Sequence, residues 1–239
     1  MAGHSKWANI KHKKERADAK KGKLFSRLTK EIINSVKQGG PDPETNPKLR
    51  LAVDKAKAAN LPNDNIERNI KKASSTDQTG YDELTYELYG HGGVGIIVEA
   101  MTDNKNRTAS DLRIATNKRG GTIASPGSVA FNFERKGIIQ IEKDKAEEEE
   151  LFLAASEAGA EDFESSEDGY VVVTPPDDLY KVKEALDQMG ISCDDVSLEM
   201  IPKTYVSCDE ESAKANEALI EWLEGIDDVD VVFHNMQRE

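Results

Sequence analysis

The sequence predicts an α+β fold in which an N-terminal three-helix bundle is followed by two ferredoxin-like α/β units, one inserted in the other. The first 74 residues show the pattern of short amphipathic helices, and the remainder alternates between strand and helix patterns. One stretch after residue 136 contains the complete order β-α-β-β-α-β, which is the ferredoxin-like arrangement. A chain of 239 residues is long enough for two or three such units.

The N-terminal segment predicts three short helices. The first spans 23–38, and its apolar side chains recur every four positions on one face, at Leu24, Leu28, Ile32 and Val36. The glycine pair 39–40 ends it. Asn46-Pro47 supplies an N-cap and a first-turn proline for a second helix, and Pro62 opens a third. Because such short helices are not stable alone, we expect them to pack as a bundle.

Residues 79–136 predict the first part of a mixed α/β unit. The continuous apolar run at 94–100 is typical of a buried strand. A capping-box pattern at 108–111 opens a helix that runs to about residue 119, with Leu112 and Ala115 facing the sheet.

Three further elements are expected in the same unit. The strand predicted at 128–135 alternates large apolar side chains, namely Val129, Phe131 and Phe133. The helix predicted at 210–223 directs three apolar side chains inward, namely Ala215, Leu219 and Trp222. This helix and a strand at 229–234 have no partners nearby in the sequence, so we expect them to complete the sheet that residue 136 leaves unfinished.

The inserted unit follows from a self-contained pattern. Its strands and helices are predicted at 138–142, 146–158, 161–165, 170–174, 176–189 and 192–201. Asp168-Gly169 supplies the turn between the two middle strands. Because this pattern closes its own sheet, the expected domains are 1–78, the discontinuous 79–136 with 203–239, and the inserted 137–202.

The charge is divided unevenly along the chain. Residues 1–73 carry 18 Lys/Arg and 8 Asp/Glu, a net charge of +10, whereas residues 137–239 carry 7 and 29, a net charge of −22. The isoelectric point near 4.9 therefore hides a basic head on an acidic body. This asymmetry predicts a polyanionic partner for the N-terminal part, although an unevenly charged, solvated surface would give the same count.

The N-terminal arm is the strongest local signal. Ten Lys/Arg, of which Lys30 is the last, stand against Glu15 and Asp18 in the first thirty residues. Cations at this density favour contact with phosphates, with solubility as the alternative role. Trp7 is suited to stacking on bases or to anchoring the arm on the bundle. The predicted nucleic-acid-binding residues here are Lys6, Trp7, Lys11, His12, Lys13, Lys14, Arg16, Lys20, Lys21, Lys23 and Arg27.

A second basic cluster surrounds the helix predicted at 108–119. Its members are Lys105, Arg107, Arg113, Lys118 and Arg119. We include them among the predicted nucleic-acid-binding residues. The last two also suit the C-terminus of a helix, where cations are stabilised by the helix dipole.

The sequence lacks the usual signals of an enzyme, a metal site or a membrane protein. The glycines at 90–93 precede a strand, so they predict a turn and not a nucleotide loop. The four histidines have no metal-site spacing, and no serine lies in a nucleophile elbow. Cys193 and Cys208 fit a reducing compartment, and no apolar stretch approaches a membrane span. We expect a cytoplasmic protein without catalytic residues, cofactor, metal or membrane contact.

Several blocks of the sequence are similar to the YebC family. These blocks are MAGHSKWANIKHKK at 1–14, DAKKGK at 18–23, GPDP at 40–43 with Asn46, NDNIER at 63–68 with IKK at 70–72, YELYG at 86–90 with GG at 92–93, TDN at 102–104 with NRT at 106–108, and GSV at 127–129 before Phe131. The resemblance covers essentially the whole chain and is least specific in the acidic C-terminal half.

The resemblance implies a three-domain fold around a cavity, with no enzyme activity and no cofactor. Members of the family are described as probable DNA-binding transcriptional regulators, a mitochondrial relative as a translational activator of a cytochrome oxidase subunit, and bacterial relatives as acting on ribosomes stalled at proline runs. The leading prediction is therefore a DNA-binding regulator of transcription. The alternatives are a translation factor that binds ribosomal RNA and relieves stalling, and a scaffold whose acidic half binds a basic protein.

The mode of recognition is expected to be backbone or shape readout. No predicted helix carries an exposed face of Arg, Asn and Gln at the spacing that reads the major groove. Such recognition suits RNA as well as DNA.

Overall fold

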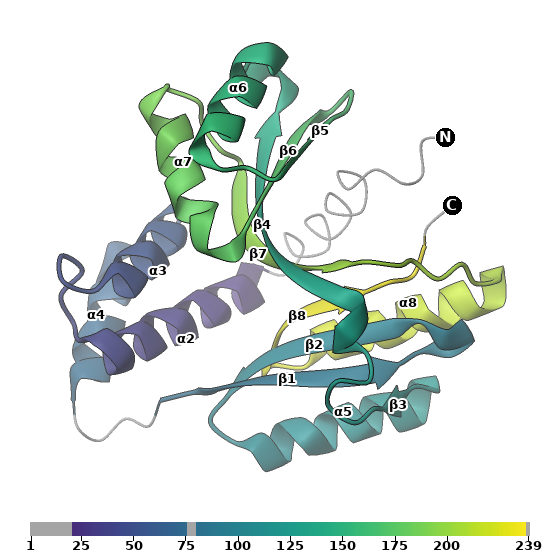
Figure 1. Ribbon diagram of the computed structural model, residues 1–239. Coiled ribbons are helices and arrows are strands. Elements are labelled where there is room, and N and C mark those ends of the chain that lie inside the picture. The colour runs from purple at the N-terminus through teal and green to yellow at the C-terminus, as the bar shows by residue number, and fades with distance from the viewer. Residues whose placement is uncertain (1–20, 76–79, 238–239) are drawn as a thin grey trace.

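The computed structural model describes residues 21–75 and 80–237, and it consists of a helical bundle and two four-stranded antiparallel sheets (Figure 1). Each sheet has two long helices on one face and carries its own apolar core. The predicted α+β class is confirmed. Among the described helices, none combines the length and the hydropathy that crossing a membrane requires.

The bundle consists of α2 (Lys21–Gly39), α3 (Pro47–Ala58) and α4 (Asn63–Ser74). The predicted apolar face of the first helix is buried against the other two, together with Ile33. The turn between α2 and α3 is fixed by Asn46, whose Oδ1 accepts a hydrogen bond from Leu49 N at 3.1 Å. The same side chain donates to Ser35 O and Gly40 O, both at 2.8 Å. The predicted N-cap is therefore confirmed, and it also ties two helices together.

The first sheet contains strands from both ends of the acidic part of the chain. Its members are β1 (Asp82–Tyr89), β2 (Gly95–Thr102), β3 (Thr122–Ile123) and β8 (Val229–His234), in the order β3-β1-β2-β8. Helices α5 (Lys105–Arg119) and α8 (Glu210–Gly225) cover one face. Because β8 pairs with β2, with Val98 opposite Val232, the last helix and strand do complete the earlier sheet as expected.

The second sheet has the predicted ferredoxin-like topology. Its elements are β4 (Phe133–Glu142), α6 (Glu148–Ala158), β5 (Asp162–Ser165), β6 (Gly169–Thr174), α7 (Leu179–Gln188) and β7 (Asp195–Pro202). The strand order β5-β6-β4-β7 corresponds to 2-3-1-4 in the β-α-β-β-α-β unit. The first sheet has the same antiparallel layout, with β1 occupying the place that the third strand has in the second sheet.

Short 3₁₀ turns complete the described structure, at His91–Gly93, Ala130–Asn132, Lys143–Lys145 and Pro176–Asp178. The glycine-containing turn at 91–93 joins β1 to β2, which confirms that it is a turn. Gly92 and Gly93 both have positive φ there, at 65° and 80°, a conformation that glycine adopts without strain.

The strand predicted at 128–135 is wrong. Residues 130–132 form a 3₁₀ turn, and Phe131 is 72% exposed instead of half-buried. The reason is the Glu87 carboxylate, which accepts hydrogen bonds from the backbone N–H groups of Val129 and Ala130 at 2.6 and 2.8 Å and from Gly127 at 2.6 Å. These bonds hold the loop closed, so the strand begins only at Phe133.

Three further differences concern the first sheet. The sequence analysis assigned no strand to β1, whose signal is the alternation of Leu84, Tyr86 and Leu88. Helix α5 begins at residue 105, because the side chain of Asn104 accepts a hydrogen bond from the backbone N–H of residue 107 at 3.1 Å. The predicted capping box at 108–111 therefore lies inside the helix.

Trp222 does not face the core as expected. It is 37% exposed, and the Arg119 guanidinium lies 5.2 Å from the centroid of its ring. The buried positions of α8 are Asn216, Leu219, Ile220 and Leu223, and Ala215 is only partly buried. Trp222 lies at the border of this stripe, since each residue rotates about 100° around the helix.

The division into independent folding units stays a prediction. The fragment 133–202 contains every strand of the second sheet, so we expect it to melt cooperatively on its own. The fragment 80–132 lacks β8 and the α8 residues that fill its core, so we expect it not to fold. Circular dichroism during thermal unfolding measures both. A cooperative transition in fragment 80–132 alone would contradict the expectation.

Candidate nucleic-acid interface

Part of the predicted interface lies outside the described residues. Lys6, Trp7, Lys11, His12, Lys13, Lys14, Arg16 and Lys20 belong to this part, and the side chain of Lys21 is also not described. The remaining predicted residues can be placed. They are Lys23, Arg27, Lys105, Arg107, Arg113, Lys118 and Arg119. The structure divides them into cations held in internal contacts and cations on the surface.

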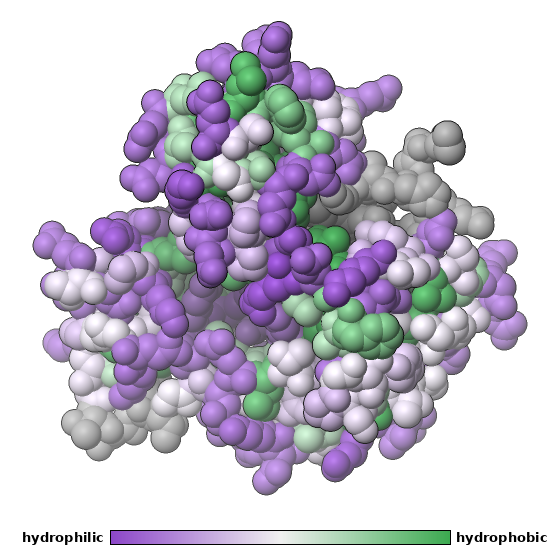
Figure 2. Space-filling model, viewed as in Figure 1, coloured by the Kyte–Doolittle hydropathy of each residue, from purple (hydrophilic) through white to green (hydrophobic). Residues whose placement is uncertain are grey.

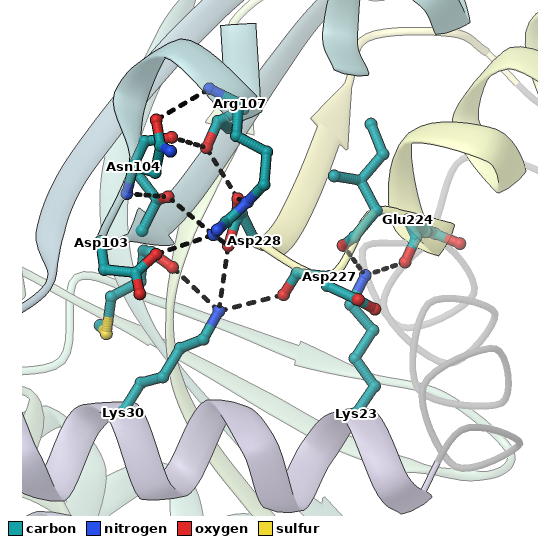
Figure 3. Close-up of polar contacts among 12 residues, drawn as sticks. Lys23, Lys30, Asp103, Asn104, Arg107, Glu224, Asp227 and Asp228 are labelled. Atoms are coloured by element: carbon teal, nitrogen blue, oxygen red, sulfur yellow. Dashed lines mark hydrogen bonds and ion pairs between the residues drawn. The ribbon is translucent and has the colours of Figure 1, made fainter. Parts of the chain in front are cut away.

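Lys30 is a buried cation at the junction of the bundle and the first sheet (Figure 3). Its Nζ donates hydrogen bonds to Met101 O at 2.9 Å and to Asp227 O at 3.0 Å, and it lies 3.9 Å from Asp228 Oδ1. A buried ammonium is stable only when its donors are paired. Lys30 therefore joins α2 to the end of β2 and to the segment before β8, instead of facing a polyanion.

Arg107 is bound by carboxylates in the same cluster. Its guanidinium forms a bidentate contact with Asp228, with Nε–Oδ2 at 2.9 Å and Nη2–Oδ1 at 2.7 Å, and it also contacts Asp103 at 2.8 Å. Burial alone would raise the pKa of Asp228, but hydrogen bonds from Arg107 and Thr108 lower it below its ordinary value. Arg107 is half-exposed, yet its charge is compensated within the fold.

Lys23 extends this junction along α2. Its Nζ donates to the backbone oxygens of Glu224 and Ile226, the latter at 2.7 Å. These carbonyls lie at the C-terminal end of α8, where a cation is favoured by the helix dipole (Figure 3). Lys23 and Lys30 therefore fasten one side of α2 to the first sheet.

Asp230 lies near the same helix on β8. Burial raises the pKa of this carboxyl to about 6, and the nearby cations Arg27 and Lys30 offset the effect only in part, with Glu31 adding to it. A carboxylate in this position costs free energy at neutral pH, when it must be charged. The junction therefore contains one carboxylate that is stabilised, Asp228, and one that is not.

The other predicted residues lie on the surface. Arg27, Arg113, Lys118 and Arg119 are exposed, and Lys105 forms an exposed ion pair with Asp82 at 3.3 Å. His91 Nε2 lies within hydrogen-bond distance of the Arg119 carbonyl, at 2.7 Å. The structure thus brings together the C-terminal turn of α5, Arg119 and the exposed ring of Trp222 as one cationic and aromatic patch.

The bundle contributes exposed cations that the predicted set did not name. They are Lys37, Lys48, Arg50, Lys57, Arg68, Lys71 and Lys72. The signal for them was the charge of residues 1–73, which the analysis assigned mainly to the arm. Figure 2 shows that the visible surface of the protein is largely hydrophilic and is hollowed where its parts meet.

The described residues include no cluster of three or more His, Cys, Asp or Glu that could hold a metal ion. Burial raises the pKa of the Cys193 thiol to about 11, so a thiolate is not available there at neutral pH. The backbone N–H groups of the loop at 127–130, which would suit a phosphate, are occupied by Glu87. Binding through surface cations is the chemistry that the described part of the chain offers.

Fold and charge define a three-part α+β protein with a basic helical head. Two family models match it: the "TACO1/YebC protein N-terminal domain" over residues 5–76 and the "TACO1/YebC second and third domain" over residues 81–236. The chain belongs to the TACO1/YebC family.

Relatives match over the full length of the chain. A probable transcriptional regulatory protein of Protochlamydia amoebophila is 66% identical over 99% of this chain and 97% of its own. A protein with the same description from Chlamydia trachomatis serovar L2 is 60% identical over 99% of this chain and all of its own. The crystal structure of a conserved hypothetical protein from Aquifex aeolicus superimposes with a TM-score of 0.86, at 44% identity, over 98% of this chain and 97% of that one.

Replacing Lys30 tests the junction. We expect Lys30→Met to destabilise the protein by about 3 kcal/mol, because it leaves a buried carboxylate and two carbonyls without their cation. The exposed Lys57→Met on α3 is the matched control and should change stability by less than about 0.5 kcal/mol. Urea unfolding followed by circular dichroism measures both. An equal, small effect of the two substitutions would contradict the assigned role of Lys30.

Asp230 predicts a pH dependence of stability. Because the folded pKa of about 6 lies above the ordinary value of 3.8, the folded state holds the extra proton between these limits. Stability therefore falls as pH rises through this window. We expect Asp230→Asn to remove this loss and to raise the melting temperature by roughly 4–8 °C at pH 8 but little at pH 4. The exposed Asp227→Asn is the control, and an unaltered pH profile in Asp230→Asn would refute the prediction.

Proposed function

We propose that this protein is a non-enzymatic, cytoplasmic regulator that binds nucleic acid through its basic N-terminal part, and that it is a DNA-binding regulator of transcription. The observation that carries the proposal is the exposed cationic surface of the bundle, where residues 21–75 carry twelve Lys/Arg against six Asp/Glu. Cations spread over three helices suit the phosphate backbone and give affinity with little sequence selectivity. The names of the relatives support the regulatory role.

The proposed contact set is refined by the structure. The arm, Arg27 and the exposed bundle cations form its main part. Arg113, Lys118 and Arg119 extend it to the first sheet, where the Trp222 ring adds an aromatic surface on which a base can stack. Lys23 and Arg107 are assigned to holding the fold, since their charges already face carbonyls or carboxylates.

A second candidate function is a ribosome-binding translation factor that relieves stalling, for example at proline runs. The observation that favours it is the strongly acidic second sheet and its flanking helices, within residues 137–239 of net charge −22. A bare duplex repels such a body, whereas a crevice in ribosomal RNA can admit the basic head alone. A basic protein partner for the acidic part is a third proposal.

Binding at several salt concentrations tests the proposed interface. We expect the affinity for duplex DNA to fall steeply with salt, at roughly 0.7–0.9 log units per log unit of salt for each phosphate contact. The triple variant Arg50→Ala, Arg68→Ala, Lys72→Ala should flatten this slope, because it removes exposed bundle cations. The matched control is Lys181→Ala, Lys203→Ala, Lys214→Ala, which removes the same charge from the acidic part.

The same proteins, sedimented with ribosomes at matched salt, distinguish the two functions. Tight binding to DNA with no ribosome co-sedimentation supports the transcription proposal. Co-sedimentation that the bundle variant abolishes, together with weak DNA binding, would replace it with the translation proposal. Equal slopes for both triple variants would show that the bundle is not the interface.

A further inference from the structure

The second sheet has one face without helices. Helices α6 and α7 cover the other face, where Ile139, Ile141 and Val172 lie in their core. The register of the strands places five carboxylates on the helix-free face: Glu134, Asp162, Glu164, Asp195 and Glu199. Lys136 is the cation on this face, and it pairs with Glu134 and Glu161. The face therefore has an excess of negative charge.

The centre of this face is apolar and buried. Ile138 and Val171 are fully buried and Val173 is 5% exposed, yet the described hydrophobic side chain that packs on them is Ile201, from the same sheet. Gln140 beside them is 3% exposed, and its Nε2 has no hydrogen-bond partner among the described residues. A buried amide without a partner is rare and indicates a surface that a further group completes.

The start of α2 lies close to this sheet. Lys23 contacts the segment that leads into β8, and β8, an edge strand of the first sheet, contacts β7, an edge strand of the second. The twenty residues before α2 carry six Lys/Arg and two Asp/Glu, with Trp7 and Ile10 as their large apolar side chains. A four-stranded sheet is only about 15 Å wide, so twenty residues suffice to cross it.

We propose that the helix-free face of the second sheet is the docking site of the chain's own N-terminal segment, residues 1–20. Its cations face the carboxylates, and Trp7 or Ile10 covers the apolar centre around Ile138. This segment is also the strongest part of the proposed nucleic-acid interface. The acidic sheet and a nucleic acid therefore compete for the same cations, so the sheet holds the arm in an inhibited state until a stronger polyanion displaces it.

The inhibitory role rests on the proposed function, whereas docking does not. The docking test uses the full chain with Trp222→Phe, so that Trp7 is the remaining tryptophan. One variant neutralises the face (Asp162→Asn, Glu164→Gln, Asp195→Asn), and its control neutralises three exposed acids on the helices of the same unit (Glu150→Gln, Glu157→Gln, Glu184→Gln). A third variant, Lys11→Ser, Lys13→Ser, Lys14→Ser, changes the arm and leaves both sheets intact.

We expect acrylamide to quench Trp7 more strongly in the face variant and in the arm variant than in the parent or the control. Trypsin should cut within residues 1–20 on the order of tenfold faster in the face variant than in the control, since three ion pairs are lost. Equal quenching of Trp7 in all four proteins would overturn docking, and the arm variant decides this even if the face variant fails to fold.

The inhibitory role is measured with a 20-base-pair duplex. The face variant should bind it several-fold more tightly than the control, although the two carry the same charge. Equal affinities would overturn inhibition. If no protein in the set binds duplex or ribosomal RNA, the proposed function fails, while the quenching of Trp7 still decides docking.

Discussion

The buried ammonium of Lys30 is the contact on which the arrangement of the protein depends. It joins a helix of the bundle to two carbonyls that lie 71 and 197 residues further along the chain. Because nearby Asp228 also binds Arg107 and Thr108, one carboxylate fixes the start of α5 as well. Losing either charge would leave the other buried, which is far more costly than losing an exposed pair. The bundle and the first sheet are therefore held as one block.

This junction also decides which cations remain for binding. Charges that the sequence presents as equivalent are used in two ways: Lys23, Lys30 and Arg107 are turned into the fold, whereas the cations on α3, α4 and the end of α5 stay on the surface. The inner cations orient the outer ones, since they set the position of α2 against the first sheet. The acidic second sheet then lies close enough to the start of α2 to compete with any polyanion that the head binds.

Much of the fold could be predicted, because its signals are local. The apolar face of α2, the Asn46 cap and the strand 229–234 were found from spacing alone, as was the β-α-β-β-α-β order of the second sheet. The failures occur where a distant group overrides a local pattern. Phe131 alternates with its neighbours as a strand residue would, but the loop that carries it is folded back by Glu87, more than forty residues earlier. Trp222 was expected in the core and instead lies outside, beneath Arg119.

The sequence by itself determined the class of fold, the order of elements in each sheet and the basic character of the N-terminal part, since these depend on residue spacing and charge within short segments. Only the tertiary structure decided which basic residues are available for binding. Arg107 and Arg113 look alike in the sequence, yet one is bound by Asp228, more than a hundred residues away, and the other faces solvent. The burial of a charge depends on which segments meet in space, and no local pattern contains that information.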